Sequence, residues 1–282
     1  MKKLLLLLLV SITQLSNANW YTNFAEAKKV AVATNKLLLV DFWATWCGPC
    51  LKMDRDSWDN AAVLNILDQS YIKVKVDIDL ERDLAGQYNV SSIPNMFILD
   101  ANGKEVHNFS GYQDPTQLKL ELEKFAYSTE FLAQENLGYA LNQNYYTAVK
   151  LALRYMDYSC FLPKEVRKTF IGIGAKYLNN AEKLNDNKKE DFKIKQEKIN
   201  LLKMYEYVYS QNFDKLQKKI QKIDLKSLNE DNVSFYQFLN LAAAKGLKNT
   251  DLANKIIVDT KELDGFQYYI DKIEFITTKN NL

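Results

Sequence analysis

The short run 37–43 (LLLVDFW) constrains the fold more than any other stretch of this chain. The run is almost entirely apolar, is rich in β-prone residues, and is too short for a buried helix. Strands of this kind occur where other elements cover both faces of a sheet. We therefore predict a central strand over 37–43 with layers of helices on either side of it.

Helical and extended patterns alternate around this strand. Phe24, Ala27 and Ala31 recur at helical spacing within 20–34. Asn102-Gly103 predicts a hairpin, because both turn positions accept positive φ, and Asp114-Pro115 predicts a helix start. The predicted elements are a helix over 20–34, the strand 37–43, helical segments 51–58 and 61–69 with a kink at 59–60, a strand over 71–78, a helix over 81–88, strands 96–99 and 104–109, and a helix over 114–127.

The second half of the chain, 128–282, has a different character. It shows no convincing strand pattern, and its helices are separated by short turns that contain Asn and Gly. The predicted helical segments are 131–141, 145–158, 163–184, 189–210, 213–223, 231–245, 251–263 and a last one after Gln267. The spacing is too irregular for a defined repeat, so we predict an all-helical array of hairpins.

The first 18 residues have the pattern of an export signal. Lys2 and Lys3 precede an apolar run over 4–10, and Ser16-Asn17-Ala18 offers the small residues that a signal peptidase recognises. The run is too short to span a membrane. We predict cleavage before Asn19 and a soluble, exported protein, most simply a periplasmic one. The expected domains are the signal 1–18, an α/β domain over 19–127 and the helical domain 128–282.

Charge argues against nucleic acid as a partner. Without Lys2 and Lys3, the chain has 35 basic and 35 acidic side chains and a formal charge of zero. Neither half carries the marked basic excess that nucleic-acid binding requires.

Cys47 and Cys50 form a CxxC pair directly after the predicted central strand, within the sequence ATWCGPC. Such a pair serves as a structural staple, as half of a metal site, or as a redox pair. A disulfide that closes so small a ring adds little stability. A structural zinc site needs four ligands, and the remaining candidates are badly placed: Cys160 lies in the other predicted domain, and the pattern places His107 on a strand at the far side. Redox chemistry is therefore the favoured interpretation.

Three local features predict that Cys47 is the reactive thiol. It lies where a helix begins, so unpaired backbone N–H groups and the positive end of the helix dipole face its sulfur. Cys50, one turn further on, can donate its S–H to that sulfur. The corner between strand and helix should expose Cys47 and leave Cys50 beneath it. The thiolate attacks a disulfide, and the second thiol then releases the product.

The run LLVDFWATWCGPC resembles the active-site strand and motif of the thioredoxin superfamily, over roughly 35–127. The resemblance implies a three-layer α/β thioredoxin fold with a central mixed sheet, and no bound cofactor or metal. It implies that Asp41 helps to deprotonate Cys50, and that Lys75 lies beside Asp41. It further implies that Ile93 and Pro94 form a cis-proline loop that holds substrate, that Trp46 is part of the rim, and that Gly111 precedes the last helix of the domain.

The residues between the cysteines bear on the direction of electron flow. Gly48 and Pro49 carry no charge, so they should stabilise the Cys47 thiolate only moderately, and by resemblance a Gly-Pro pair implies a reductant. The helix predicted before the first strand and the run 53–60 (MDRDSWDN) resemble exported thioredoxin-like proteins of bacteria, including modules of thiol:disulfide interchange proteins, more than small cytosolic thioredoxins. This implies disulfide-containing exported proteins as substrates and a membrane electron donor. The alternatives are an oxidase or isomerase, or a client-binding helical array with a minor redox role.

The role of the helical half is open. One hypothesis is a binding surface for an unknown partner, placed next to the dithiol. The favoured interpretation of its aromatic residues is core packing, and Cys160 is expected to be a buried apolar residue. The aromatic set is Tyr139, Tyr145, Tyr146, Tyr155, Tyr158, Tyr205, Tyr207 and Tyr209.

Overall fold

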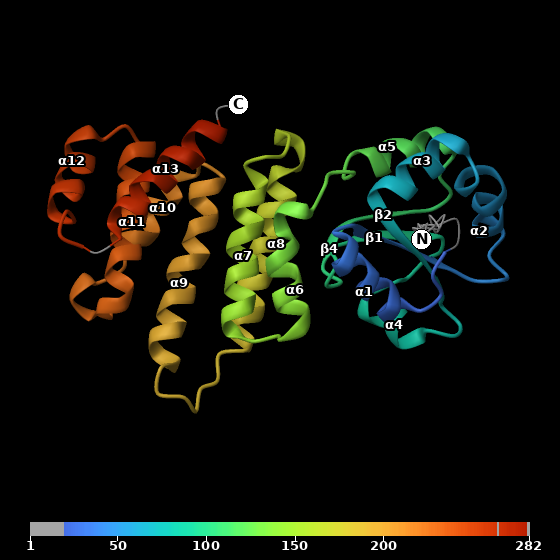
Figure 1. The fold of residues 1–282 in the computed structure, drawn as a ribbon, viewed down its shortest axis with the longest axis horizontal. Helices are drawn as coiled ribbons and strands as arrows, with labels where there is room; N and C mark the ends of the chain where they lie inside the picture. The colour runs from blue at the N-terminus through green and yellow to red at the C-terminus, as the bar shows by residue number, and fades with distance from the viewer. Residues whose placement is uncertain (1–19, 264, 281–282) are drawn as a thin grey trace, which may run out of the picture.

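The computed structural model describes residues 20–263 and 265–280. The predicted export signal, 1–18, lies outside the described residues. Figure 1 shows two lobes, one built on a sheet and the other made of helices. The described part of 128–280 contains no strand, which confirms the predicted change of fold class along the chain.

The first lobe contains a four-stranded mixed sheet in the order β2-β1-β3-β4. Its strands are β1 (Leu37–Trp43), β2 (Tyr71–Asp77), β3 (Asn95–Leu99) and β4 (Glu105–Ser110). Strand β1 has the predicted bounds and is buried along nearly its whole length. It pairs in parallel with β2 and antiparallel with β3. The central position of β1 explains its continuous apolar sequence, because both of its faces are covered.

Helices cover both faces of this sheet, so the predicted three-layer arrangement is confirmed. Ala27, Ala31 and Ala85 on one side pack against the face formed by Leu38, Val40, Phe42 and Phe97. The other face packs against Met53, Val63, Leu67 and Leu118. The helices are α1 (Phe24–Thr34), α2 (Gly48–Met53), the π-helical turn η1 (Asp54–Trp58), α3 (Ala61–Ser70), α4 (Arg82–Gln87) and α5 (Pro115–Glu123).

Several predicted boundaries were wrong. Helix α1 begins at Phe24 rather than Trp20, because Asn23 caps it and Tyr21 instead bridges to the edge of β2. Helix α5 ends at Glu123 rather than Tyr127. The predicted β3–β4 hairpin is present, but β4 begins at Glu105 rather than Lys104, since Leu99 pairs with Glu105 and the loop runs from Asp100 to Lys104. Of the two expected turn residues, Gly103 alone has positive φ.

The second lobe is an array of helices that follows the 3-10 turn η2 (Glu130–Leu132). The helices are α6 (Ala133–Leu141), α7 (Tyr145–Ser159), α8 (Lys164–Lys183), α9 (Phe192–Tyr209), α10 (Phe213–Ile220), α11 (Glu230–Gly246), α12 (Thr250–Asp259) and α13 (Phe266–Asn280), with a further 3-10 turn η3 (Leu225–Ser227). Each predicted helix is present. Within the described ranges, no helix combines the length and the apolar character needed to cross a membrane.

Most of the aromatic residues of this lobe pack in its core, as predicted. Tyr155 and Tyr177 stack with ring centroids 5.6 Å apart, and Tyr205 lies edge-on to Phe238 at 5.2 Å. Helix α8 can approach α7 closely because Gly174 has no side chain: a Cβ there would lie 2.7 Å from the carbonyl oxygen of Ala152. Tyr146 is an exception, with 57% of its surface exposed.

The two lobes are joined by the loop between β3 and β4, which inserts into the helical lobe. Asp100 in this loop is fully buried. One of its carboxylate oxygens accepts hydrogen bonds from the backbone N–H groups of Asn102 and Lys104, at 2.9 and 2.8 Å. The other accepts from the hydroxyls of Tyr155 and Tyr177, at 3.1 and 2.6 Å. Four donors thus surround one carboxylate, and the two tyrosines tie the sheet to α7 and α8.

This junction places the helical lobe away from the dithiol. The strand register sets Leu38 opposite Leu99 and Phe42 opposite Asn95, so the 100–104 loop follows the end of β3 that lies beside the start of β1. The cysteines follow the opposite end of β1. In Figure 1, α2 accordingly lies on the far side of the first lobe from the helices. The expectation that the helical array lies next to the dithiol was therefore wrong, because the docking loop is at the other end of the sheet.

We predict that Tyr177→Phe destabilises the protein through this junction. The variant removes a hydrogen bond to a buried carboxylate, which should lower the free energy of unfolding by about 2 kcal/mol. Urea denaturation followed by circular dichroism measures this change. Tyr146→Phe, which removes an exposed hydroxyl, is the matched control and should change stability little. Equal effects of the two substitutions would contradict the role assigned to Asp100.

Candidate active site

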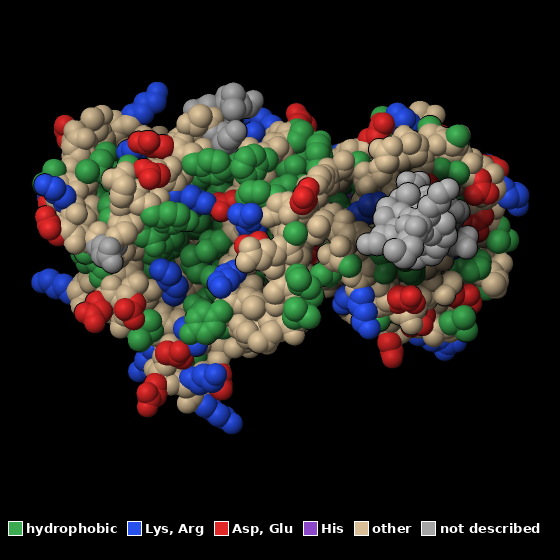
Figure 2. All heavy atoms as spheres, viewed as in Figure 1, with side chains coloured by type: hydrophobic (Ala, Val, Ile, Leu, Met, Phe, Trp, Pro, Cys, Tyr) green, Lys and Arg blue, Asp and Glu red, His purple; other side chains and the backbone are tan. Residues whose placement is uncertain are grey.

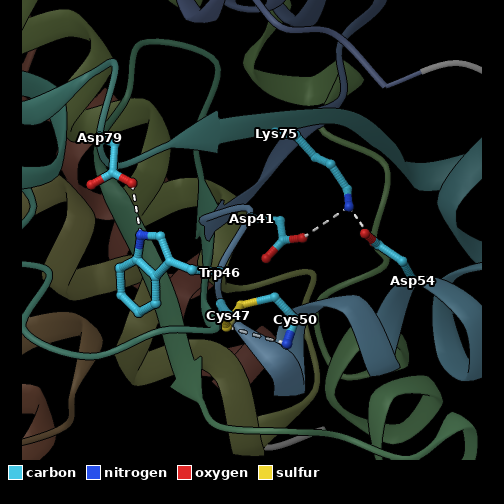
Figure 3. Close-up of a disulfide and its surroundings, with 7 residues drawn as sticks. All are labelled: Asp41, Trp46, Cys47, Cys50, Asp54, Lys75 and Asp79. Carbon is cyan, nitrogen blue, oxygen red and sulfur yellow. Dashed lines mark hydrogen bonds and ion pairs between the residues drawn. A yellow bond between two sulfur atoms is a disulfide. The ribbon is translucent and has the colours of Figure 1, made fainter.

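The Cys47–Cys50 disulfide lies where β1 gives way to α2 (Figure 3). Cys47 is the N-cap residue of α2, and its sulfur accepts a hydrogen bond from the backbone N–H of Cys50 at 3.2 Å. Pro49 fits the first turn of the helix because it needs no N–H partner there. Gly48 and Pro49 add no charge to this turn. The local sequence therefore aims the positive end of a helix at the sulfur of Cys47, as predicted.

The two cysteines are almost equally buried in this oxidised form. Cys47 is 4% exposed and Cys50 is 3% exposed. The expectation that Cys47 is exposed above a buried Cys50 was therefore wrong. Ala44 and the partly buried side chains of Trp43, Ile78 and Ile93 pack around the pair and cover both sulfurs.

Trp46 and the Ile93–Pro94 loop form the rim of the site. Trp46 is 65% exposed, and its indole N–H donates a hydrogen bond of 2.7 Å to Asp79, which fixes the ring beside Cys47. Ile93 packs against the disulfide cluster, and the Ile93–Pro94 peptide bond is cis. Gly111 has positive φ, and its N–H bonds to the carbonyl oxygen of Pro94. The structure thus brings Trp46, Ile93 and Pro94 together at the disulfide.

Asp41 lies beneath the disulfide, within the buried strand β1. The parallel register places Asp41 directly beside Lys75 of β2, and the Lys75 ammonium is 3.7 Å from one Asp41 oxygen. Figure 3 shows the carboxylate of Asp41 between this ammonium and the disulfide. Within the described part of the chain, the other Asp41 oxygen is buried without a hydrogen-bond partner. That oxygen has an unused lone pair for a proton.

The environment shifts the acidity of Asp41 towards neutrality. Burial raises its pKa from 3.8 to about 6, while the Lys75 ammonium acts in the opposite direction and the Asp54 carboxylate adds to the rise. A carboxylate with such a pKa can accept and return a proton near neutral pH.

Sequence analysis missed Asp54 and Trp58, both of which come from η1. Asp54 is ion-paired with Lys75, which it therefore shares with Asp41. Trp58 is buried, and its indole N–H makes no hydrogen bond among the described residues. The N–H dipole nevertheless favours the ionised form of Asp41 and so lowers its pKa. The spacing of four residues between Cys50 and Asp54 was the available signal, because such pairs share a helix face.

The remaining sequence candidates lie elsewhere. His107 is on β4, where its ring nitrogen lies 3.0 Å from Glu121. Cys160 is buried in the helical lobe, as expected, and burial raises the pKa of its thiol to about 11. Neither residue belongs to the disulfide site. In 20–263 and 265–280, no group of three or more His, Cys, Asp or Glu side chains is arranged to hold a metal ion.

Comparison with known proteins identifies a family for the first lobe. A family model described as a thioredoxin-like domain matches residues 24–126. The thioredoxin-like protein slr0233 of Synechocystis is 37% identical over 109 residues, which cover 37% of this chain and 93% of that protein. The thiol-disulfide oxidoreductase ResA of Bacillus anthracis is 30% identical over 129 residues, covering 38% of this chain and 74% of ResA. The solved structure of a mutant thioredoxin from Halobacterium salinarum is 28% identical, covers 38% of this chain and 89% of its own, and gives a TM-score of 0.32.

We predict that Asp41→Asn stabilises the folded protein at pH 7. The folded pKa of Asp41 lies above its unfolded value, so its contribution to the free energy of unfolding falls as pH rises from 3.8 to about 6. A rise of about two pKa units corresponds to roughly 3 kcal/mol of destabilisation when Asp41 is ionised. Asn carries no charge, so the variant should regain this free energy of unfolding at pH 7. Urea denaturation at pH 4 and pH 7 measures the effect, and the gain should vanish at the lower pH. Asp83→Asn, at an exposed carboxylate, is the control; a gain that persists at pH 4 would contradict this account.

We also predict that Asp54→Asn lowers the pKa of Asp41. Removal of the Asp54 charge leaves the Lys75 ammonium to Asp41 alone, which favours the ionised form of Asp41. Titration of the Asp41 carboxyl carbon by NMR measures this shift directly. Asp56→Asn, from the exposed face of η1, is the matched control. An Asp41 pKa that stays the same in both variants would show that Lys75 is not shared.

Proposed function

The chain belongs to the thioredoxin superfamily of thiol–disulfide oxidoreductases, and on that premise we propose that it reduces disulfides in exported proteins. The observation that carries the proposal is the arrangement of a disulfide at a helix N-terminus above a buried carboxylate whose pKa is about 6. The same arrangement supplies a nucleophile, a resolving thiol and a base.

The reaction begins from the reduced pair. The Cys47 thiolate, stabilised by the N-terminus of α2 and by the Cys50 N–H, attacks one sulfur of the client disulfide. A bond forms between Cys47 and that sulfur, the client S–S bond breaks, and the departing client thiolate takes up a proton from water. The exposed indole of Trp46 and the Ile93–Pro94 loop are proposed to hold the client segment beside Cys47.

The second step releases the client. The Cys50 thiol gives its proton to the free oxygen of Asp41 and attacks the sulfur of Cys47. The mixed disulfide breaks, the Cys47–Cys50 disulfide forms, and the second client thiolate leaves. Two electrons have then passed from the protein to the client. Lys75 is proposed to limit the rise in the pKa of Asp41, so that the carboxylate remains ionised at neutral pH.

The uncharged Gly48-Pro49 pair supports the reducing direction, since nothing between the cysteines adds further stabilisation to the thiolate. The signal-like residues 1–18 support export, most simply to a periplasm, with 19–127 as the catalytic domain. A reductant in an oxidising compartment must be reduced again, so we propose a membrane electron donor. An oxidase or isomerase is the alternative, which a reduction potential above that of the glutathione couple would favour.

We predict that Cys47→Ser abolishes the acceleration by this protein of insulin reduction by dithiothreitol, leaving only the uncatalysed rate, because Ser cannot provide the thiolate. Cys50→Ser should instead accumulate mixed disulfides with client proteins in the exported compartment, visible as reducible adducts on gels. Cys160→Ser is the control and should retain activity. If Cys47→Ser matches the wild type in insulin turbidity assays, and Cys50→Ser traps no client, the reductase proposal fails.

A further inference from the structure

The helical lobe contains a groove whose function the dithiol chemistry does not explain. The groove has a volume of about 500 Å³ and lies between the start of α8 on one side and the end of α9 with the start of α10 on the other. Its walls carry an excess of cations. Among the described residues that line it, Lys164, Arg167, Lys168 and Lys215 face a single carboxylate, that of Glu206.

Helix geometry brings the cations to the same groove. Lys164, Arg167 and Lys168 are spaced by three and four residues at the start of α8, so they share one face of that helix. Lys215 comes from the first turn of α10, where Asn212 caps the helix. Pro163 precedes α8 without a side-chain cap, so the positive end of this long helix adds to the positive potential of the groove.

The three lysines of the groove have no acidic partner among the described residues. In the described part of the chain, Lys164, Lys168 and Lys215 form no ion pair, whereas Lys203 and Lys245 of the same lobe pair with Glu182 and Glu274. Lys215 instead lies 4.9 Å from the ring centre of Tyr207. The Arg167 side chain is held by a hydrogen bond of 2.8 Å to the carbonyl oxygen of Leu162. Like charges held close together repel one another unless an anion lies between them.

The floor of the groove is apolar. Ile171 and Tyr209 line it and are almost fully buried. The Tyr209 hydroxyl donates to Asp157, so its polar end is occupied inside the lobe. The groove therefore has an apolar base between a cationic wall on α8 and a wall on which Lys215 and Glu206 carry opposite charges. By contrast, the face shown in Figure 2 carries basic and acidic side chains intermixed, without a continuous region of one sign.

We propose that this groove binds an extended acidic segment of a client polypeptide. A single compact anion would need donors that converge on one point, whereas these cations stand on opposite walls of an open groove. Carboxylates spaced along an extended chain can reach both walls, and an intervening apolar side chain can lie against the base formed by Ile171 and Tyr209. Tyr and Arg, both present here, are favoured at protein interfaces.

The consequence of this binding rests on the proposed function. The Asp100 junction holds the helical lobe against the sheet, so the groove is at a fixed position relative to Cys47. A client held by its acidic segment would present its disulfide to the dithiol at a raised effective concentration. The groove would thereby select clients that carry an acidic segment at a suitable distance from their disulfide.

The test is a binding measurement that involves no redox step. The probe is a short fluorescein-labelled peptide that alternates glutamate with leucine and contains no cysteine, titrated with the mature oxidised protein and followed by fluorescence anisotropy. The triple variant Lys164→Glu, Lys168→Glu, Lys215→Glu should bind at least about tenfold more weakly. The matched control, Lys218→Glu, Lys219→Glu, Lys222→Glu, changes exposed lysines of α10 and the following turn outside the groove and should bind like the wild type. Circular dichroism checks the folding of both.

Four results would overturn the proposal. The first is equal binding of a peptide in which glutamine replaces glutamate, and the second is equal weakening in both triple variants. The third is displacement of the peptide by inorganic phosphate at concentrations too low to act through ionic strength. The fourth is preferential binding to phosphatidylglycerol vesicles, which would assign the groove to a membrane surface. Because the probe cannot be reduced, a failed insulin assay would leave this result intact, and a failed binding assay would leave the reductase proposal intact.

Discussion

The burial of β1 on both faces is the constraint on which the chemistry of this protein depends. A strand so placed should contain no charge, yet Asp41 lies within it and is 2% exposed. An isolated buried carboxylate would simply remain protonated. The neighbouring strand prevents this by placing Lys75 at the matching register position, which keeps the pKa of Asp41 at about 6. Sheet pairing, rather than the cysteine motif alone, thus sets the acidity beneath the disulfide.

Asp100 is a second buried carboxylate, and unlike Asp41 it has hydrogen-bond donors at both of its oxygens. Its oxygens accept from two backbone N–H groups and two tyrosine hydroxyls, so they have no capacity left for a transferred proton. Asp41 has one oxygen that shares a lysine with Asp54 and one oxygen with no partner among the described residues. Both acids are buried, and burial raises the pKa of both. The two carboxylates therefore differ in how many hydrogen-bond donors surround them: Asp100, with four, is suited to holding the lobes together, and Asp41, with a free oxygen, is suited to proton transfer.

The contrast between local and long-range contacts explains what could be predicted from the sequence. The strand 37–43 and the helix start at Cys47 follow from patterns a few residues long, and the structure reproduces them. The hydrogen bonds from Tyr155 and Tyr177 to Asp100 span 55 and 77 residues, and no local pattern encodes them. The ion pair of Asp54 depends on η1, where the helix locally adopts π geometry. The burial of Cys47 depends on Ile93, a residue from a distant loop that packs over it.

The position of the contact between the two lobes determines which parts of the sheet lobe stay accessible beside the helical array. Docking at the 100–104 loop leaves the rim around Trp46 and Ile93 open, because the loop and the cysteines lie at opposite ends of the sheet. A helical lobe placed over the rim would compete with clients for it. A lobe fixed at the far end can contribute only through clients long enough to reach both places. On the proposed function, this geometry would favour extended or unfolded polypeptides over compact ones, and the proposed binding of an acidic segment in the α8–α10 groove would suit the same kind of chain.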